Sequence, residues 1–376
     1  MIGFWSQVGE ALYMAAAMAW EILWPLVLGF TLSAMVQAVV SKRAMSKLLP
    51  DASPKALAVA TALGAASSSC SYAAVALARS LVRKGADFIA AMAFELASTN
   101  LVAELGIVLA VLMGWEFTLA EFIGGPIMVA IMALLFRLLV SEKLVGAARE
   151  QAEKGLAGKM EGHAEMDMSV TEGPLLQRIF SEKGRTAISH YFVMDWAAIW
   201  KDIALGLLLA GVMAAFVPNG FWSALFLQGH PTLAKLWGPV IGPLVAVISF
   251  VCSVGNVPLA AVLWNGGISF GGVISFLFAD LIVLPILNIY RRYYGLKMTG
   301  AILGIFYLSM VLAALAVEFG FQALGLVPSQ RHAQVVEAAF RWNYTTFLNI
   351  GFLVLAAALV VRFFRTGGSK MLKEMA

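Results

Sequence analysis

Long apolar stretches recur along the whole chain and are separated by shorter polar connections. Each of seven stretches can cross a bilayer core of about 30 Å as one helix. Their apolar residues are continuous rather than alternating, which excludes a transmembrane β-barrel. The pattern therefore predicts an all-α polytopic membrane protein. The expected spans are residues 18–40, 86–112, 117–140, 201–217, 268–290, 299–317 and 342–361.

Two further apolar stretches, about 54–84 and 236–266, do not fit a single span well. Each is about 30 residues long, whereas one crossing needs ~20. The serines of Ser67–Ser71 and the glycine Gly255 lie inside them, and both residue types help to end a helix. Each stretch is therefore either one crossing or a re-entrant hairpin of two half-helices.

These two stretches belong to an internal repeat. An offset of 182 residues places Cys70 on Cys252 and Ser71 on Ser253, and these are the two cysteines of the chain. Ten of the 28 positions from 70 to 97 are identical to the positions 182 residues later, without a gap. Internal repeats of this size are typical of secondary transporters.

The basic residues favour the hairpins. With two hairpins, 22 of the 26 Lys and Arg fall on one side, only Lys235, Arg331 and Arg341 fall on the other, and Arg137 lies at a span end. With two full crossings the split is 12 against 13. Because basic residues accumulate on the cytoplasmic side, we expect hairpins, an outside N-terminus and a cytoplasmic C-terminus.

This topology predicts two inverted repeats, each built as span, re-entrant hairpin, span, span. The first repeat covers residues 18–140 and the second covers 201–317, with a final span at 342–361. Between the repeats, residues 141–200 form a polar cytoplasmic loop, and "AISHYFVMDWAAIWKD" at its end resembles an amphipathic interfacial helix.

Composition narrows the class of function. The chain is 61% hydrophobic and 13% charged, against roughly 25% charged in soluble domains. Its net charge of +4 reports membrane orientation rather than nucleic-acid binding. Residues 1–17 contain no Lys or Arg, so we expect no secretory signal peptide. No nucleotide-binding or hydrolytic motif is present, so we expect neither an enzyme nor a cofactor. The bilayer is the expected partner, and a homo-oligomer is left open.

The hairpin tips are the first candidate site. Exposed backbone groups at membrane depth occur only where they are buried in protein or line a wet cavity. Half-helix N-termini there can hold an anion or a polarised substrate. The alternative is that Cys and Ser are small residues that allow close helix packing. The candidate substrate-binding residues are Ser69, Cys70, Ser71, Cys252, Ser253, Gly255 and Asn256.

Acidic residues inside the spans are the second candidate. "AFELASTNLVAEL" contains Glu95, Asn100 and Glu104, and the last two would share a helix face at i, i+4. Asp280 aligns with Ser98 in the repeat. Charged groups at this depth are costly and mark ion or proton pathways, so we expect proton coupling or, alternatively, bridging between helices. Three further acids lie nearer the span ends and are expected at the interface: Glu21, Asp87 and Glu121.

The polar loop carries a weak metal-binding pattern. "KMEGHAEMDM" clusters Met160, His163, Met166 and Met168. Thioether and imidazole groups suit soft ions such as Cu(I). The alternative is a flexible linker with incidental methionines.

The repeat cores resemble a known family. "SSCSYAAVAL" and "FVCSVGNVPL", followed by "AFELAST" and "SFLFADL", are similar to the predicted permease family that includes the organoarsenical efflux permeases. That family has a "CSCS"-like turn, "PL", a Gly and "AFLLASP" in each half. Here Ser68 and Phe250 replace the earlier cysteines and Ala76 replaces one proline. The resemblance implies a permease of the bacterial inner membrane that exports trivalent organoarsenicals, with Cys70 and Cys252 as ligands.

Three functions remain open at this stage. The first is proton-coupled export of a soft metalloid or metal species by alternating access. The second is a permease for a small anion or a sulfur compound, in which the cysteines only pack. The third is a membrane subunit that hands metal to a partner through the Met/His loop.

Overall fold

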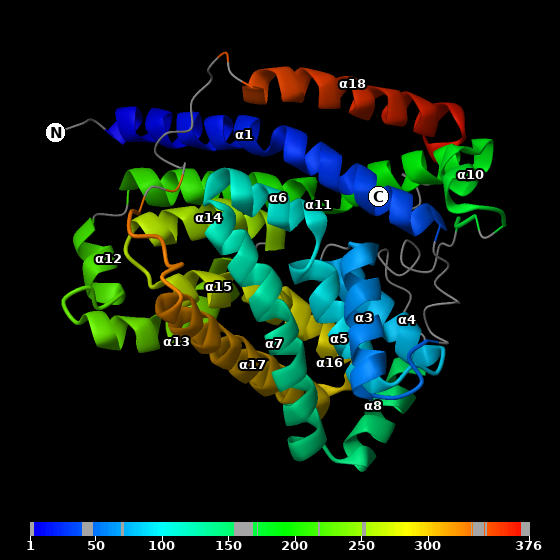
Figure 1. Ribbon diagram of the computed structural model, residues 1–376, viewed down its shortest axis with the longest axis horizontal. Helices are drawn as coiled ribbons and strands as arrows, with labels where there is room; N and C mark the ends of the chain where they lie inside the picture. The colour runs from blue at the N-terminus through cyan, green and yellow to red at the C-terminus, as the bar shows by residue number, and fades with distance from the viewer. Residues whose placement is uncertain are drawn as a thin grey trace.

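The protein is seen here in a computed structural model. The model describes residues 4–39, 48–68, 71–153, 168–170, 172–216, 219–249, 253–331, 333, 342 and 344–369. This described part of the chain is helical and contains no strand, as the apolar pattern predicts (Figure 1).

The first half contains seven helices in the described residues. Ser53 caps the first half-helix through its side chain, and Pro54 occupies the first turn, where a missing N–H costs nothing. Asp87 caps a later helix by accepting from the backbone N–H groups of Ile89 and Ala90. The helices are α1 (Phe4–Val39), α3 (Pro54–Ser67), α4 (Ser71–Arg83), α5 (Phe88–Asn100), α6 (Ala103–Leu112), α7 (Trp115–Leu139) and α8 (Glu142–Glu153).

The second half follows the same order of long and short helices. Its helices are α10 (Leu175–Phe180), α11 (Glu182–Phe216), α12 (Asn219–Leu225), α13 (Pro231–Ser249), α14 (Ser253–Asn265), α15 (Phe270–Phe278), the short 3₁₀ helix η1 (Ala279–Ile282), α16 (Leu284–Tyr294) and α17 (Leu296–Ala323). Helix α18 (Tyr344–Arg365) follows them.

Helix boundaries recur at the offset found in the sequence. Ser71 begins α4 and Ser253, 182 residues later, begins α14. Equivalent helices also have equivalent neighbours, since α3 packs on α5 as α13 packs on α15, and α4 packs on α16 as α14 packs on α6. The second arm of each hairpin therefore contacts the other half of the molecule.

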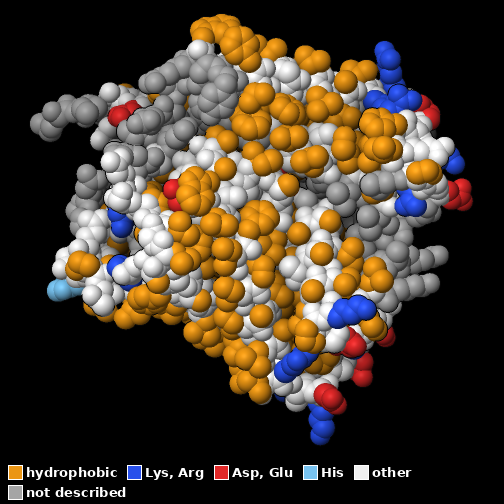
Figure 2. All heavy atoms as spheres, viewed as in Figure 1, with side chains coloured by type: hydrophobic (Ala, Val, Ile, Leu, Met, Phe, Trp, Pro, Cys, Tyr) orange, Lys and Arg blue, Asp and Glu red, His pale blue; other side chains and the backbone are white. Residues whose placement is uncertain are grey.

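The central helix pair runs antiparallel. In Figure 1, α1 starts at the N-terminus on the left, whereas α11 runs from α10 on the right to α12 on the left. Helices α1 and α11 pack along each other, and α18 lies against both. In Figure 2, Lys and Arg side chains gather at the upper and lower right, and few appear at the left.

Within the described residues, five helices are long and apolar enough to cross a membrane, or six if a bent pair counts as one span. The five are Ile22–Val39, Phe88–Leu112, Trp115–Leu139, Leu296–Ala323 and Thr345–Arg365. The bent pair, Phe270–Ile282 with Leu284–Tyr294, turns by 44°. These six coincide with six of the seven expected spans, and the seventh, 201–217, corresponds to the shorter apolar stretch Ile203–Met213 of α11. The protein is therefore a multi-pass membrane protein.

The connection between the halves differs from the expectation in one respect. Helix α11 runs without a break through residue 200, where an interfacial segment was expected to end and a span to begin. Tyr191 and Phe192 are buried, so this part of α11 packs inside the protein. Trp200, at the end of this part of α11, is exposed.

Candidate functional site

In each of the two helix pairs, α3–α4 and α13–α14, the end of the second helix lies beside the start of the first. The backbone N–H of Asp87, just after α4, donates to the carbonyl of Leu49, just before α3, at 2.8 Å. In the second half, Gln228 Nε2 before α13 donates to the carbonyl of Gly266 after α14 at 2.7 Å. Both pairs are therefore hairpins whose two ends are hydrogen-bonded together.

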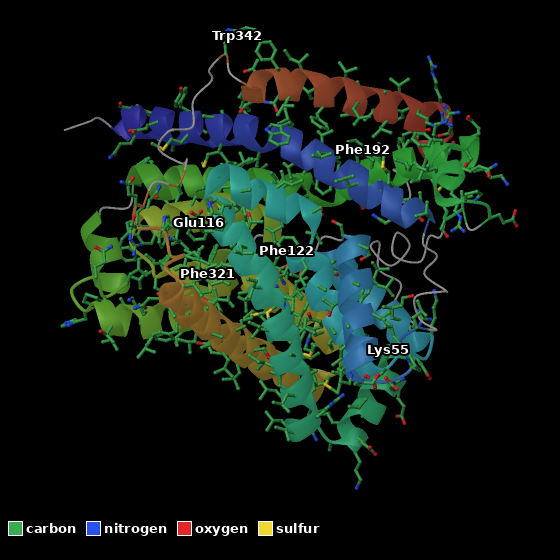
Figure 3. The ribbon with its side chains drawn as sticks, in the orientation of Figure 1. Lys55, Glu116, Phe122, Phe192, Phe321 and Trp342 are labelled. Carbon is green, nitrogen blue, oxygen red and sulfur yellow. The ribbon has the colours of Figure 1, made fainter. Side chains whose placement is uncertain are left out.

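The two hairpins start from opposite ends of the molecule. Arg149 in α8 donates to the carbonyl of Ala86 at the base of the first hairpin, and α8 also contacts α17. Lys235 near the base of the second hairpin donates to Gln322 at the far end of α17. The 28 residues of α17 span about 42 Å at 1.5 Å per residue. Figure 3 shows Lys55 and Phe321 far apart, beside the two bases.

Two other helices break at equivalent positions. Helix α5 ends at Asn100 and α6 begins at Ala103, while η1 and Val283 interrupt the path from α15 to α16. Val102 and Val283 precede α6 and α16 in extended conformation, and neither provides a side-chain cap. Both breaks therefore leave helix ends inside the protein.

The first break corrects one sequence prediction. Asn100 and Glu104 were expected on one face of a continuous helix, but they lie on either side of the break. The physical reason is the "STN" end of α5. The Ser98 and Thr99 hydroxyls and the Asn100 amide donate to backbone carbonyls of their own helix, in the kind of local bonding that competes with helix continuation.

The first hairpin tip contacts the second break directly. Ser71, the first residue of α4, donates from Oγ to Asp280 Oδ2 in η1 at 2.6 Å. Both residues are buried, with 1% and 0% exposure. The second hairpin reaches the same place, since α13 and α14 both pack against η1. Both hairpins therefore meet at η1.

Buried carboxyl groups surround this meeting point. Tyr290 in α16 donates its hydroxyl to Glu95 Oε1 in α5, so these two helices are linked across the halves. Asp280 acts electrostatically on both Glu95 and Glu121. All three carboxyl groups are fully buried. Burying like charges together is expensive, so this arrangement is suited to binding a cation or proton.

Glu121 is the functional candidate that the sequence interpretation missed. It was expected at the membrane interface, but its side chain is 0% exposed within α7. Neither of its carboxylate oxygens has a hydrogen-bond partner among the described residues. The sequence signal that could have indicated this burial is the pair Gly124 and Gly125, since glycines allow another element to approach a helix closely. A Cβ on Gly125 would lie 2.4 Å from Leu101 at the first break, so α7 approaches that break closely.

Glu104 occupies a different position from the other acids. It lies in the first turn of α6, and its Oε2 is buried without a hydrogen-bond partner in the described part of the chain. Helix α1 presses against it, because a Cβ on Gly29 would lie 2.1 Å from Glu104 Cβ. Asn288, two turns beyond Asp280, is exposed and accepts from Arg291.

Part of the predicted tip is described and part is not. Gly255 and Asn256 are buried in the first turn of α14. Ser69, Cys70 and Cys252 lie outside the described residues, and so does the side chain of Ser253. Ser68, the described residue directly before Ser69, adopts φ 31°, a backbone conformation rare outside glycine.

The metal-binding pattern of the loop is mostly outside the described ranges. Met160, His163 and Met166 fall there. Met168 packs against the hydrophobic core, and its backbone N–H donates to Tyr191. Among the residues that the structure describes, no group of three or more His, Cys, Asp or Glu is arranged to hold a metal ion.

Comparison with known proteins supplies the family. The family model described as "Predicted permease" matches residues 7–319. The protein named "Putative permease Rv2963" of Mycobacterium tuberculosis is 63% identical over 312 residues, which cover 83% of this chain and 77% of that protein. No solved structure matches the chain. The match includes both hairpins, both helix breaks and every buried acid discussed above, and the chain belongs to this predicted permease family.

Proposed function

We propose that the protein is a secondary permease that exports a soft metalloid or metal species by alternating access across the bacterial inner membrane. The substrate would bind where the two hairpin tips and the two helix breaks meet. The observation that carries this proposal is the hydrogen bond from Ser71 to Asp280. It ties the serine of one Cys-Ser tip to the broken helix of the other half.

The proposed topology is a pair of inverted repeats with re-entrant hairpins. Three observations support it: the helix boundaries recur at one offset, α1 and α11 run antiparallel (Figure 1), and the hairpin bases are tied near opposite ends of α17. Broken helices at an interface between repeats are the usual location of transporter sites. In this topology the N-terminus is outside and the C-terminus is cytoplasmic.

The proposed substrate class rests on the two cysteines. Cys70 directly precedes Ser71 at one tip, and Cys252 directly precedes Ser253 at the other. Thiolate groups favour soft species such as Cu(I), and a trivalent arsenical has two or more positions that thiols can fill. Two tips that meet at η1 would let both thiols bind one such centre.

Proton coupling is the proposed energy source. Glu95, Asp280 and Glu121 are buried together, and one proton bound among them would relieve the repulsion between their charges. If that proton is released on one side of the membrane and substrate is bound on the other, proton movement is coupled to substrate transport. Glu104 is separate from this group and would serve the contact between α1 and α6.

A small anion is the second candidate substrate. Helices α4 and α6 both begin in the interior near the breaks. Helix N-termini carry unpaired N–H groups and positive dipole ends, which attract anions. In this case the cysteines would only pack.

The experiment is a resistance and uptake assay in a sensitive bacterium with methylarsenite, arsenite, copper and silver. The native chain is compared with Cys70→Ser, Cys252→Ser and the double variant. We expect the native chain to lower accumulation of one soft species, and each variant to lose that effect. Membrane abundance of each variant, measured on immunoblots, controls for expression.

The other outcomes separate the alternatives. If the double variant protects as well as the native chain, the thiols do not contact substrate and the anion candidate gains support. If the native chain protects against none of the four species, the proposed substrate class is wrong. Deleting residues 154–167 should not change the result, since the proposal gives no role to the loop methionines.

A further inference from the structure

A pocket lies at the open end of the second hairpin, away from the tips. Its volume is about 510 Å³, within the range usual for small-molecule sites. The start of α13, the end of α14, the end of α17 and residues 327–331 line it. We call it the mouth pocket; the residues that carry its charge and its aromatic wall are Lys235, Arg331, Glu318, Trp264 and Phe270.

The arginine of the mouth pocket is held in place. Arg331 Nη1 donates to the carbonyls of Trp264 and Ile268 at 2.9 and 2.7 Å. Its guanidinium lies 4.4 Å from the centre of the Trp264 ring. The Arg331 guanidinium is held by two carbonyl groups and by the indole ring. It is therefore already oriented before a ligand binds, which lowers the cost of binding.

Among the described residues that line the pocket, two cations face one carboxylate. Glu318 is only 2% exposed, and its Oε2 accepts from the backbone N–H of Gly271 at 2.5 Å. Lys235 and Arg331 both act on it electrostatically. The carboxylate balances one of these cations. The ammonium of Lys235 gives one hydrogen bond to Gln322 at 2.9 Å and has two further N–H groups.

The position of these cations is unusual for this chain. In the topology expected from the sequence, most Lys and Arg fall on the cytoplasmic side, and only three fall on the opposite side. Two of those three, Lys235 and Arg331, line this one pocket. Orientation in the membrane does not require basic residues on this side, so a local binding role accounts for them better.

We propose that the mouth pocket binds a small organic monoanion, such as a carboxylate with an apolar body. The carboxylate would accept from Lys235 beside Arg331, and the apolar body would contact Trp264 and Phe270. This site is distinct from the hairpin tips. It does not depend on which substrate the tips carry, because its ligand is defined by the charge and aromatic wall of the pocket itself.

The test is direct binding to the purified full chain, without transport. The probe is 4-fluorobenzoate, followed by ligand-observed fluorine NMR in detergent, with protein-free micelles as the partition blank. The neutral isostere 4-fluorobenzyl alcohol has the same ring without the charge. We expect saturable binding of the benzoate, weakened by added salt, and at least about fivefold weaker binding of the alcohol.

Three variants make the test specific. Lys235→Gln should weaken benzoate binding about fivefold or more, whereas Lys235→Arg keeps the charge and should retain it. Lys55→Gln, at the opposite end of the molecule (Figure 3), should have no effect. The proposal is overturned if the benzoate shows no saturable binding, if the alcohol binds equally well, or if Lys235→Gln binds like the native chain.

Discussion

The Ser71 hydroxyl lies 2.6 Å from Asp280 Oδ2, and this hydrogen bond joins residues that are 209 positions apart. Ser71 begins the returning arm of the first hairpin, and Asp280 lies in the short helix that interrupts a span of the second half. A movement of one half against the other would have to stretch or break this bond. The presence of this hydrogen bond therefore depends on the relative position of the two halves.

Ser71→Ala should lower both transport and stability. A hydrogen bond to a charged group contributes about 1.5–3 kcal/mol, and the variant leaves a buried carboxylate without this donor. Thermal unfolding in detergent and the uptake assay measure the two effects. Ser80→Ala is the control, since Ser80 is buried in the same helix but lies away from its first turn. Equal effects of the two variants would contradict a special role for the Ser71 contact.

Glu121→Gln should remove the pH dependence of transport while leaving the protein folded. The glutamine has the same shape and carries no charge, so it ends the repulsion with Asp280 and cannot exchange a proton. Uptake at several external pH values, with and without a proton uncoupler, measures the change. Glu116→Gln in the first turn of the same helix is the control. A Glu121→Gln variant that still responds to pH as the native chain does would remove Glu121 from the coupling group.

Glu121 also illustrates what the sequence could not provide. Glu121 lies close to the start of the apolar stretch 117–140, which indicates an interfacial position. Whether its side chain is buried depends on which neighbouring helices cover that face of α7, and the sequence does not show this. The break after Asn100 was also missed, because Leu101 and Val102 continue the apolar pattern without a Gly or Pro. The Ser-Thr-Asn triplet was the available signal.

Other features followed from sequence patterns that have a direct physical cause. The repeat offset located the interruptions between α3 and α4 and between α13 and α14, because a Cys-Ser pair occurs at both. The apolar stretches located the spans, because length and continuity are what a bilayer requires. The Ser71–Asp280 contact could not be predicted. Asp280 aligns with Ser98 and Ser71 aligns with Ser253, so the repeat does not relate the two residues to each other.

Gly29→Ala should destabilise the contact between α1 and α6. The added Cβ would lie 2.1 Å from Glu104 Cβ and 2.6 Å from its Cα, so the helices must separate. Overpacking of this kind costs about 1–3 kcal/mol. Gly9→Ala in the same helix meets nothing within 4 Å and should be neutral or stabilising by up to about 1 kcal/mol. Melting temperatures in the same detergent compare them, and equal values would contradict the close approach.

Acidification should weaken the contact between α11 and the end of α18. His190 Nε2 lies 2.8 Å from Thr366 Oγ1, and its ring lies 4.9 Å from the Phe363 ring. Burial lowers the pKa of His190 below its usual value of about 6.5. The folded state therefore disfavours the charged ring. This stabilisation is present above about pH 6.5 and is lost as the pH falls toward the lower folded pKa.

Thermal unfolding between pH 7.5 and pH 5.5 measures this effect in native protein and in His190→Gln. The native protein should lose more stability over that range than the variant, because the variant has no ring to protonate. His230→Gln, which changes an exposed histidine, should behave like the native chain. A His190→Gln variant with the native pH dependence would exclude His190 as the cause.

The central claim is that the two Cys-Ser tips form one site, and phenylarsine oxide tests it most directly. Its trivalent arsenic binds two thiols at once with release of water, and this chain has only two cysteines. Titration of the purified protein, with arsenic counted per chain after gel filtration, should give one arsenic per chain. Cys70→Ser and Cys252→Ser should each lose that retained arsenic. Retention by either single variant at the native level, or none by the native chain, would contradict a shared site at the tips.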